Sequence, residues 1–189
     1  MFRWKNNQNA QEKATAYATQ RDFQQIFTED MAGLHLLAFL LTADADKSEQ
    51  CFVAGLETSI DGNHVFRQWA RSWSKRAIIK NAIKMLMPTP GQPGPLLQTD
   101  VAWTRDPQSN SLITAVARLA ALERFVLVMT VLENYPVREC AALLSRSAEE
   151  VMTAKSQALQ GLGSPSAAQA AAPRGAEAWA GFLAPTELA

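Results

Sequence analysis

The residues best suited to chemistry lie at positions 64–87, where six basic side chains occur and no acidic one. They recur at intervals of four and would form two rows on one helix: Arg67, Arg71 and Lys75, and Arg76, Lys80 and Lys84. Phe66, Trp69 and Trp73 are interleaved with them. Phosphates bind cations, and unstacked bases stack on flat aromatic faces, so the pattern predicts a surface for single-stranded or locally opened nucleic acid. The alternative is that the tryptophans are core and the cations only solvate the outer face.

A second segment, residues 136–162, has the pattern of two short helices joined by a tight turn. Residues 137–144 are amphipathic, and the polar residues 145–147 interrupt them. Ser147 is placed to cap the second helix, and two glutamates follow in the first turn, where the helix dipole favours acids. We interpret the segment as a helix-turn-helix, whose second helix would lie in a DNA major groove. An ordinary helical hairpin is the alternative.

Helical spacing of apolar residues dominates the rest of the chain, and strand alternation is almost absent. The predicted elements are an apolar helical stripe at 23–41, a short helix at 47–56, a turn at 59–63, a long helix at 65–87, a Pro/Gly-rich linker, and a further helix from 112 to about 133. The sequence thus predicts an all-α protein of two small helical domains joined by a Pro-rich linker, the second domain a helix-turn-helix. The boundaries are a polar arm at 1–20, the first domain at 21–87, the linker at 88–111, the second domain at 112–162 and an Ala/Pro-rich tail at 163–189.

Composition argues against several classes of function. The chain has 18 basic and 18 acidic residues, so any nucleic-acid contact depends on local segregation of charge. Cys51 and Cys140 are isolated, and neither the histidines nor the carboxylates are grouped for catalysis or metal binding. We expect no enzyme activity, no metal and no cofactor. The N-terminus lacks a signal-peptide pattern, and the apolar runs are too short to span a bilayer, so we expect a cytoplasmic protein without a membrane partner.

The order of these segments resembles the extracytoplasmic-function sigma factors of bacterial RNA polymerase. In the second domain the family pattern is matched by Leu119, Leu122, Arg124, Val126, Val128, Glu139, Ala141, Leu144, Ser147 and Val151. In the first, a segment resembles the helix with which the family binds the polymerase clamp: Ser48, Glu49, Gln50, Phe52 and Leu56. Trp73 and Asn81 are similar to the Trp and Asn of the promoter-melting helix.

The resemblance implies core RNA polymerase and promoter DNA as partners, and a regulator such as an anti-sigma factor as a third. The predicted DNA-binding residues are Arg67, Trp69, Arg71, Trp73, Lys75, Arg76, Lys80 and Asn81 in the first domain, and Ser147, Thr153, Lys155 and Gln157 in the second. The second helix departs from the family, because residues 148–162 contain two acids and one base where the family has several arginines. The competing prediction is a protein-binding adaptor that keeps the fold, reads no DNA and uses Met152 and Leu159 against a partner.

Overall fold

The structure is a computed structural model that describes residues 16–62, 65–91 and 107–163. Helices make up 82% of these residues, and no strand occurs among them, so the predicted all-α class is confirmed. The chain divides into two compact units, Met1–Met87 and Pro88–Ala189. None of the helices within the described ranges is long and apolar enough to cross a membrane. Most of the predicted arm, linker and tail lies outside the described residues.

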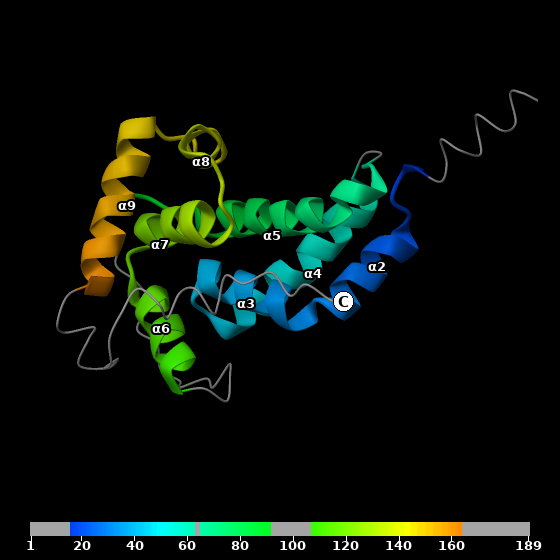
Figure 1. Cartoon of the computed structure of the whole chain (residues 1–189), viewed down its shortest axis with the longest axis horizontal. Helices are drawn as coiled ribbons and strands as arrows, with labels where there is room; N and C mark the ends of the chain where they lie inside the picture. The colour runs from blue at the N-terminus through cyan, green and yellow to red at the C-terminus, as the bar shows by residue number, and fades with distance from the viewer. Residues whose placement is uncertain (1–15, 63–64, 92–106, 164–189) are drawn as a thin grey trace, which may run out of the picture. The chain divides into compact units, whose positions relative to one another are not determined.

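The first unit contains α2 (Gln20–Glu29), α3 (Met31–Thr42), α4 (Ala45–Asp61), the 3-10 turn η1 (Arg67–Trp69) and α5 (Ala70–Leu86). Helices α4 and α5 pack along each other, α3 packs against both, and α2 packs against α5 and α4 (Figure 1). The fully buried side chains of this core include Leu34, Leu41, Cys51, Ala70, Ile78 and Ile79. Removal of these apolar side chains from water drives the packing of the helices.

The closest approach of α4 to α5 depends on Gly55. A Cβ atom on Gly55 would lie 2.6 Å from Ile78 Cγ1 and 3.4 Å from Ile78 Cα. Beside it, the Cys51 thiol donates to the carbonyl of Ile78 at 3.3 Å, and burial raises the pKa of this thiol to about 12. The glycine therefore lets the two backbones pack without an intervening side chain.

The apolar segment at 23–41, which was predicted to be one helix, forms two helices. Asp30 interrupts it with φ −109° and ψ 28°, and Met31, expected on the inner face, is 55% exposed. The carboxylate of Asp30 accepts a hydrogen bond from Arg71 Nη1 of α5 at 3.1 Å, a partner 41 positions away. Because this partner is distant in sequence, local periodicity gave no sign of the break.

Helix α2 begins with a reciprocal cap. The Thr19 hydroxyl accepts from the backbone N–H of Asp22, and the Asp22 carboxylate accepts from the backbone N–H of Thr19. The hydrogen bonds from Thr19, and more weakly the charge of Arg67, hold the pKa of the Asp22 carboxyl below its usual value. Asp22 therefore stays ionised through the neutral range and can pair with a cation.

Helix α4 extends beyond the predicted 47–56 at both ends, and the predicted turn at 59–63 is wrong as far as residue 61. The Asp44 side chain caps the start by accepting from the backbone N–H of Lys47 at 2.9 Å. Near the end, Ser59 is buried, and its hydroxyl donates to the carbonyl of Gly55 at 2.7 Å. A serine whose hydroxyl donates to a carbonyl of the preceding turn can stay inside a helix, although the composition of residues 59–63 suggested a turn.

The helix predicted at 65–87 begins later. Phe66 forms an isolated antiparallel bridge with Tyr17, and the backbone N–H of Ala18 donates to the carbonyl of Val65 at 2.7 Å. The chain is therefore extended at this point, and Arg67 lies on η1 instead of on the predicted basic row of α5.

The second unit contains α6 (Pro107–Arg118), α7 (Ala121–Leu127), the π-helical turn η2 (Val128–Leu132), α8 (Val137–Leu144) and α9 (Ala148–Gly163). Helix α9 packs against α7 and α8 (Figure 1). The fully buried side chains of this unit include Phe125, Val126, Leu127, Val128, Met129 and Val151. Helix α6 begins at a proline inside the predicted linker, and proline is well suited to a first helical position because the missing N–H needs no partner there.

The single helix predicted from 112 to about 133 is wrong, because the chain turns between α6 and α7. Arg124 of α7 is 2% exposed, and its Nη1 donates to the carbonyls of Ala117 at 3.2 Å and Leu119 at 2.9 Å. These carbonyls lie where α6 ends, so the buried guanidinium satisfies groups that a helix end leaves without partners. Burial lowers the pKa of Arg124 to about 10, which still leaves it charged at neutral pH.

The turn between α8 and α9 has the capping that the sequence predicted. Helix α8 ends at Ser145 in the left-handed conformation, with φ 53°. The Ser147 hydroxyl accepts from the backbone N–H of Glu150 at 3.1 Å, and the Glu150 carboxylate accepts from the backbone N–H of Ser147 at 2.8 Å. These two hydrogen bonds form a capping box that fixes the start of α9.

We predict that Gly55→Ala lowers the free energy of unfolding by about 1–3 kcal/mol, because the new methyl group overlaps Ile78. Ile78→Ala alone removes buried carbon and should cost about 2–5 kcal/mol. The double variant should lose less than the sum, since the cavity at residue 78 accepts the added methyl. Denaturant unfolding of the four proteins measures this. A stabilisation of about 0.5–1 kcal/mol in Gly55→Ala, as helix propensity alone gives, contradicts the close approach.

Candidate functional site

Three aromatic rings, which we call the aromatic cluster, lie just before the start of α5. The rings of Tyr17 and Phe66 stack with centroids 4.8 Å apart, and Trp69 meets Phe66 edge-on at 5.2 Å. The bridge between Tyr17 and Phe66 fixes the first pair. Trp69 is 56% exposed and Phe66 39%, an unusual degree of exposure for large aromatic side chains. The cluster is therefore a preformed aromatic surface open to solvent.

Arg67 and Arg71, two of the predicted phosphate-binding cations, flank Trp69 in the sequence, and both are paired with acids. Arg67 Nη2 lies 3.3 Å from Asp22 Oδ2, while Arg71 lies 3.1 Å from Asp30 Oδ2 and 3.7 Å from Glu29 Oε2. Both arginine side chains are more than half exposed. Exposed pairs of this kind contribute about 0–1 kcal/mol each, so a phosphate can replace the carboxylate at little cost.

The other cations of the two predicted basic rows lie on α5. Lys75 and Arg76 are half-buried, whereas Lys80 and Lys84 are exposed. The Lys80 ammonium lies 5.9 Å from the ring centroid of Trp73, within the range of a cation–π contact. The exposed basic surface is consequently narrower than the two continuous rows that the sequence suggested.

Trp73 and Asn81, the two residues that resemble the family's melting motif, contribute to the packing of the first unit. Trp73 is half-buried, and its indole nitrogen is inaccessible to solvent and has no hydrogen-bond partner. The amide nitrogen of Asn81 lies within hydrogen-bond distance of Ala54 O at 3.2 Å and Thr58 Oγ1 at 2.9 Å, both on α4. It also reaches Ala77 O at 2.9 Å. Asn81 therefore joins α4 to α5, and Trp69 is the more exposed of the two tryptophans that the structure describes.

The predicted polymerase-binding residues of α4 are divided between its two faces. Ser48 is buried, and its hydroxyl donates to the carbonyl of Ala45 at 2.7 Å. Phe52 faces inward and meets Phe27 edge-on with centroids 5.1 Å apart; Leu56 is half-buried. These residues position the helix, so only Glu49 and Gln50 of the five reach the outer surface.

The outer face of α4 carries a shallow hollow of about 550 Å³, which we call the acidic face. It is lined by Asp46, Glu49, Gln50, Val53, Ala54 and Glu57. Val53 is 47% exposed and lies among three carboxylates, so the surface combines an apolar centre with an acidic rim. The sequence interpretation missed Asp46, Val53 and Glu57, although their spacing of four and seven residues along a helix could have revealed the shared face.

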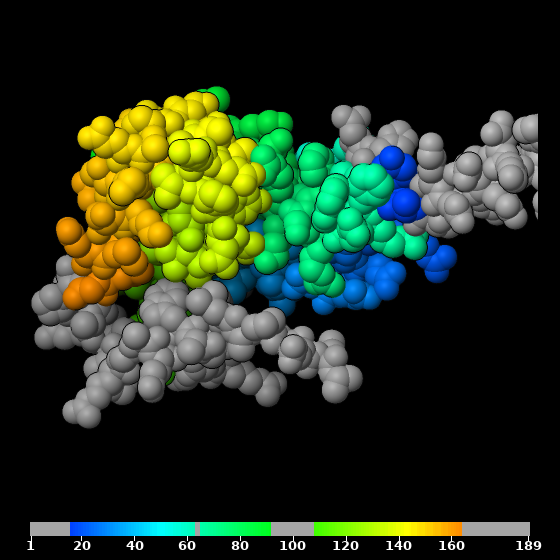
Figure 2. All heavy atoms as spheres, turned by 45° about the horizontal axis from the view of Figure 1, so that its top comes forward, coloured from blue at the N-terminus to red at the C-terminus, as the bar shows by residue number. Residues whose placement is uncertain are grey.

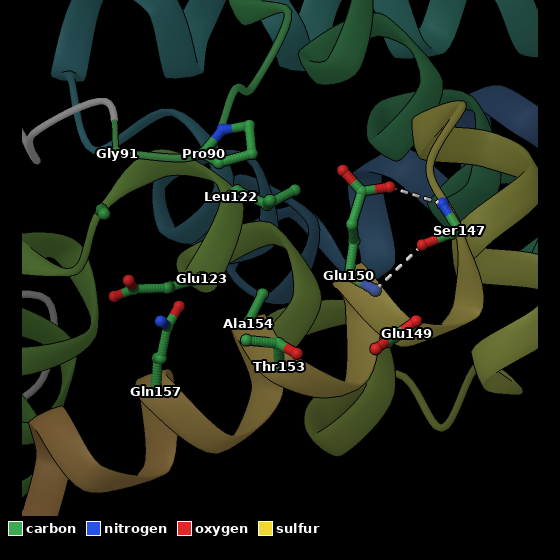
Figure 3. Close-up of a pocket in the computed structure, with 11 residues that line it drawn as sticks. Pro90, Gly91, Leu122, Glu123, Ser147, Glu149, Glu150, Thr153, Ala154 and Gln157 are labelled. Atoms are coloured by element: carbon green, nitrogen blue, oxygen red, sulfur yellow. Dashed lines mark hydrogen bonds between the residues drawn. The ribbon is translucent and has the colours of Figure 1, made fainter.

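In the second unit, a hollow of about 420 Å³ lies beside α9 (Figure 3). Its lining residues are Pro90, Gly91, Ala120, Leu122, Glu123, Ser147, Glu149, Glu150, Thr153, Ala154 and Gln157. Three carboxylates and no cation are among them. The hydrogen bonds from Ser147 hold the pKa of Glu150 below its usual value, so that carboxylate stays ionised. The hollow is therefore acidic and unsuited to a phosphate.

The predicted DNA-reading residues of α9 do not share one face. Thr153 and Gln157 line the acidic hollow, and Ser147 is committed to the cap. Lys155 lies two positions from Thr153 and two from Gln157. In a helix of 3.6 residues per turn, two positions correspond to a rotation of about 200° around the axis. The one cation of α9 thus lies on the opposite side from its predicted polar partners.

The outer side of α9 carries exposed apolar residues. Met152 is 60% exposed and Leu159 49%, and seven positions separate them, so they lie on one side of the helix. Between them, the hydroxyl of Ser156 donates to the carbonyl of Met152 at 3.1 Å. We call Met152, Ser156 and Leu159 the apolar stripe. Figure 2 shows the surface of α8 and α9 in yellow to orange.

Neither cysteine is placed for chemistry. Both are buried, and burial, reinforced by the nearby charge of Glu139, raises the pKa of the Cys140 thiol to about 11. In the part of the chain that the structure describes, no three His, Cys, Asp or Glu side chains are grouped to hold a metal ion. Comparison of the chain with known protein families, curated proteins and solved structures gave no match.

Proposed function

We propose that the chain is a sigma-factor-like protein of bacterial transcription that binds core RNA polymerase and opened DNA through its first unit. The observation that carries the proposal is the exposed ring of Trp69, which contacts Phe66 in the aromatic cluster. Arg67 and Arg71 flank it in the sequence, and both arginine side chains are more than half exposed. Such a protein acts in the bacterial cytoplasm, where the polymerase and the promoter are. Residues 21–87 and 112–162 would then be its two domains.

The first step of the proposed interaction is electrostatic. A DNA backbone approaching the cluster meets Arg67, Arg71 and Lys80, and the phosphates replace Asp22 and Asp30 as partners of the arginines. The exchange costs little because the pairs are exposed, and it releases counterions from the DNA. This step supplies affinity without reading the sequence.

The second step is stacking. A base that has left the duplex stack can lie on the exposed ring of Trp69, which Phe66 already holds in place. Trp73 is less suited to this role because it is half-buried and Lys80 lies over its ring. The proposal therefore assigns stacking to Trp69 and a supporting role to Trp73 and Asn81.

The acidic face of α4 is the proposed binding surface for core RNA polymerase. Its exposed centre at Val53 and its carboxylates at Asp46, Glu49 and Glu57 complement a basic element with an apolar centre. The inward side chains of Phe52 and Leu56 hold the helix in place. A rigid helical face of this kind needs little ordering on binding.

The second unit is proposed to be a helix-turn-helix that reads DNA weakly or not at all. Groove binding requires cations around the base readers, whereas the hollow beside α9 gathers Glu123, Glu149 and Glu150. Lys155 is turned away from Thr153 and Gln157. In this proposal the second unit keeps the fold of a promoter-reading ancestor, and its surface has become acidic.

A second candidate function is a protein-binding adaptor, favoured by this same acidic surface of α9 and by its exposed Met152 and Leu159. An adaptor of this kind binds a partner protein, such as an anti-sigma factor, and no nucleic acid. The two candidates differ in whether the first unit binds DNA.

We predict that Trp69→Ala weakens binding to a DNA duplex with an unpaired bubble by about 5- to 150-fold, the range expected when one base can no longer stack. Trp69→Phe should retain part of the affinity because it keeps a ring. Fluorescence anisotropy of labelled DNA at one fixed salt concentration measures the effect. Met31→Ala is the matched control, because Met31 is exposed to nearly the same degree, 55%, in the same unit.

Equal affinity of Trp69→Ala and the parent would refute the stacking role, and no binding by the parent would favour the adaptor. Replacing Arg67, Arg71 and Lys80 with Gln should flatten the salt dependence by about one unit of slope for each phosphate that the variant no longer binds. The same thermal midpoint in all variants shows that binding, not folding, has changed.

For the polymerase-binding surface, we predict that Glu49→Lys reduces capture of core RNA polymerase by the full chain at least about tenfold, because it places a cation against a basic partner surface. Glu149→Lys makes the same change of net charge on the second unit and should leave capture nearly unchanged. Equal reductions in both variants would indicate an effect of overall charge and contradict binding at the acidic face.

A further inference from the structure

We infer that the apolar stripe of α9 is an interaction surface for the C-terminal segment of the same chain, residues 164–189. The stripe, Met152, Ser156 and Leu159, makes no polar demand on an occupant, because the Ser156 hydroxyl already donates to the Met152 carbonyl. Both large side chains remain about half exposed or more, at 60% and 49%. A complementary occupant therefore needs a few large apolar side chains and no specific hydrogen bonds.

The C-terminal segment supplies side chains of this kind. Among its many alanines, the large apolar residues concentrate at Trp179, Phe182 and Leu183, between Pro173 and Pro185. Their spacing of three and four residues would bring them to one face of a short helix. The apolar side chains of this segment and those of the apolar stripe can thus cover each other from water.

The length of the chain permits the interaction. Helix α9 ends at Gly163, so Leu159 and Met152 lie about 6 and 17 Å back along its axis at 1.5 Å per residue. Residues 164–178 connect Gly163 to Trp179, and a flexible chain of that length has an average end-to-end distance of about 20 Å. The tether therefore matches the span, and it maintains an effective concentration in the millimolar range, at which even a weak interaction is populated.

A second copy of the chain is a poorer occupant. A stable dimer buries about 1,200–2,000 Å² in total, whereas the stripe offers two large side chains. Only a tethered partner avoids the entropic cost of bimolecular association at such a small surface. The docked segment covers the outer side of α9. Any effect of this docking on the binding of DNA or of a partner protein at α9 rests on the proposed function, whereas the docking itself does not.

The test uses the methyl resonances of methionine in the full chain, in a chain ending at Gly163, and in the full chain with Trp179→Ala, Phe182→Ala and Leu183→Ala. The aromatic rings of the docked segment should shift the Met152 methyl resonance, which is assigned with Met152→Leu. The shift should disappear in both altered chains. Met31, which is 55% exposed and lies in the first unit, should show the same resonance in all three proteins and serves as the control.

The shift in the full chain should also be unchanged by tenfold dilution, as an intramolecular interaction requires. An identical Met152 resonance in the full and shortened chains overturns the inference. A shift that fades on dilution overturns it too, because the occupant would then be a second copy. No DNA or polymerase enters the measurement, so its failure and the failure of the proposed function are separate results.

Discussion

The pairing of Arg67 and Arg71 with acids at the two ends of α2 sets the geometry of the surface that is proposed to bind DNA. Arg71 contacts Glu29 and Asp30, and Asp30 interrupts what would otherwise be one long helix. Arg67 pairs with Asp22, whose carboxylate also caps α2. The same charges that could attract phosphate are therefore paired within the first unit. Because the pairs are exposed, they orient the arginines without sequestering them.

At the start of α9, helix stability favours acidic residues, whereas DNA binding would require basic ones. Glu150 completes the capping box with Ser147, and acids in a first turn stabilise a helix through its dipole. A helix that enters a major groove would instead place cations at these positions. In this chain the capping acids are present, and the hollow beside α9 contains three carboxylates and no cation, which makes it a poor surface for phosphate.

The sequence predicts helical segments well where the signal is local. The range of α8 and the capping of α9 by Ser147 follow from amphipathic spacing and from residues three positions apart. The break at Asp30 was missed because its partner Arg71 lies 41 positions away on another helix. The break before α7 was missed because neither Gly nor Pro occurs there, and spacing alone did not reveal that Arg124 would be buried against the end of α6. For the same reason the pattern could not distinguish the exposed Trp69 from the half-buried Trp73. Residues four apart on one predicted helix look equivalent until the start of α5 at Ala70 separates them.

The central claim is that the aromatic cluster at the start of α5, and not α9, contacts nucleic acid. Hydrogen exchange of the full chain with and without bubble DNA, read peptide by peptide, tests it directly. The account predicts slower exchange of the backbone amides in η1 and the first turns of α5, together with unchanged exchange in α9. Protection of α9 with none at η1 would contradict the account and return α9 to the role of DNA reader that the sequence predicts.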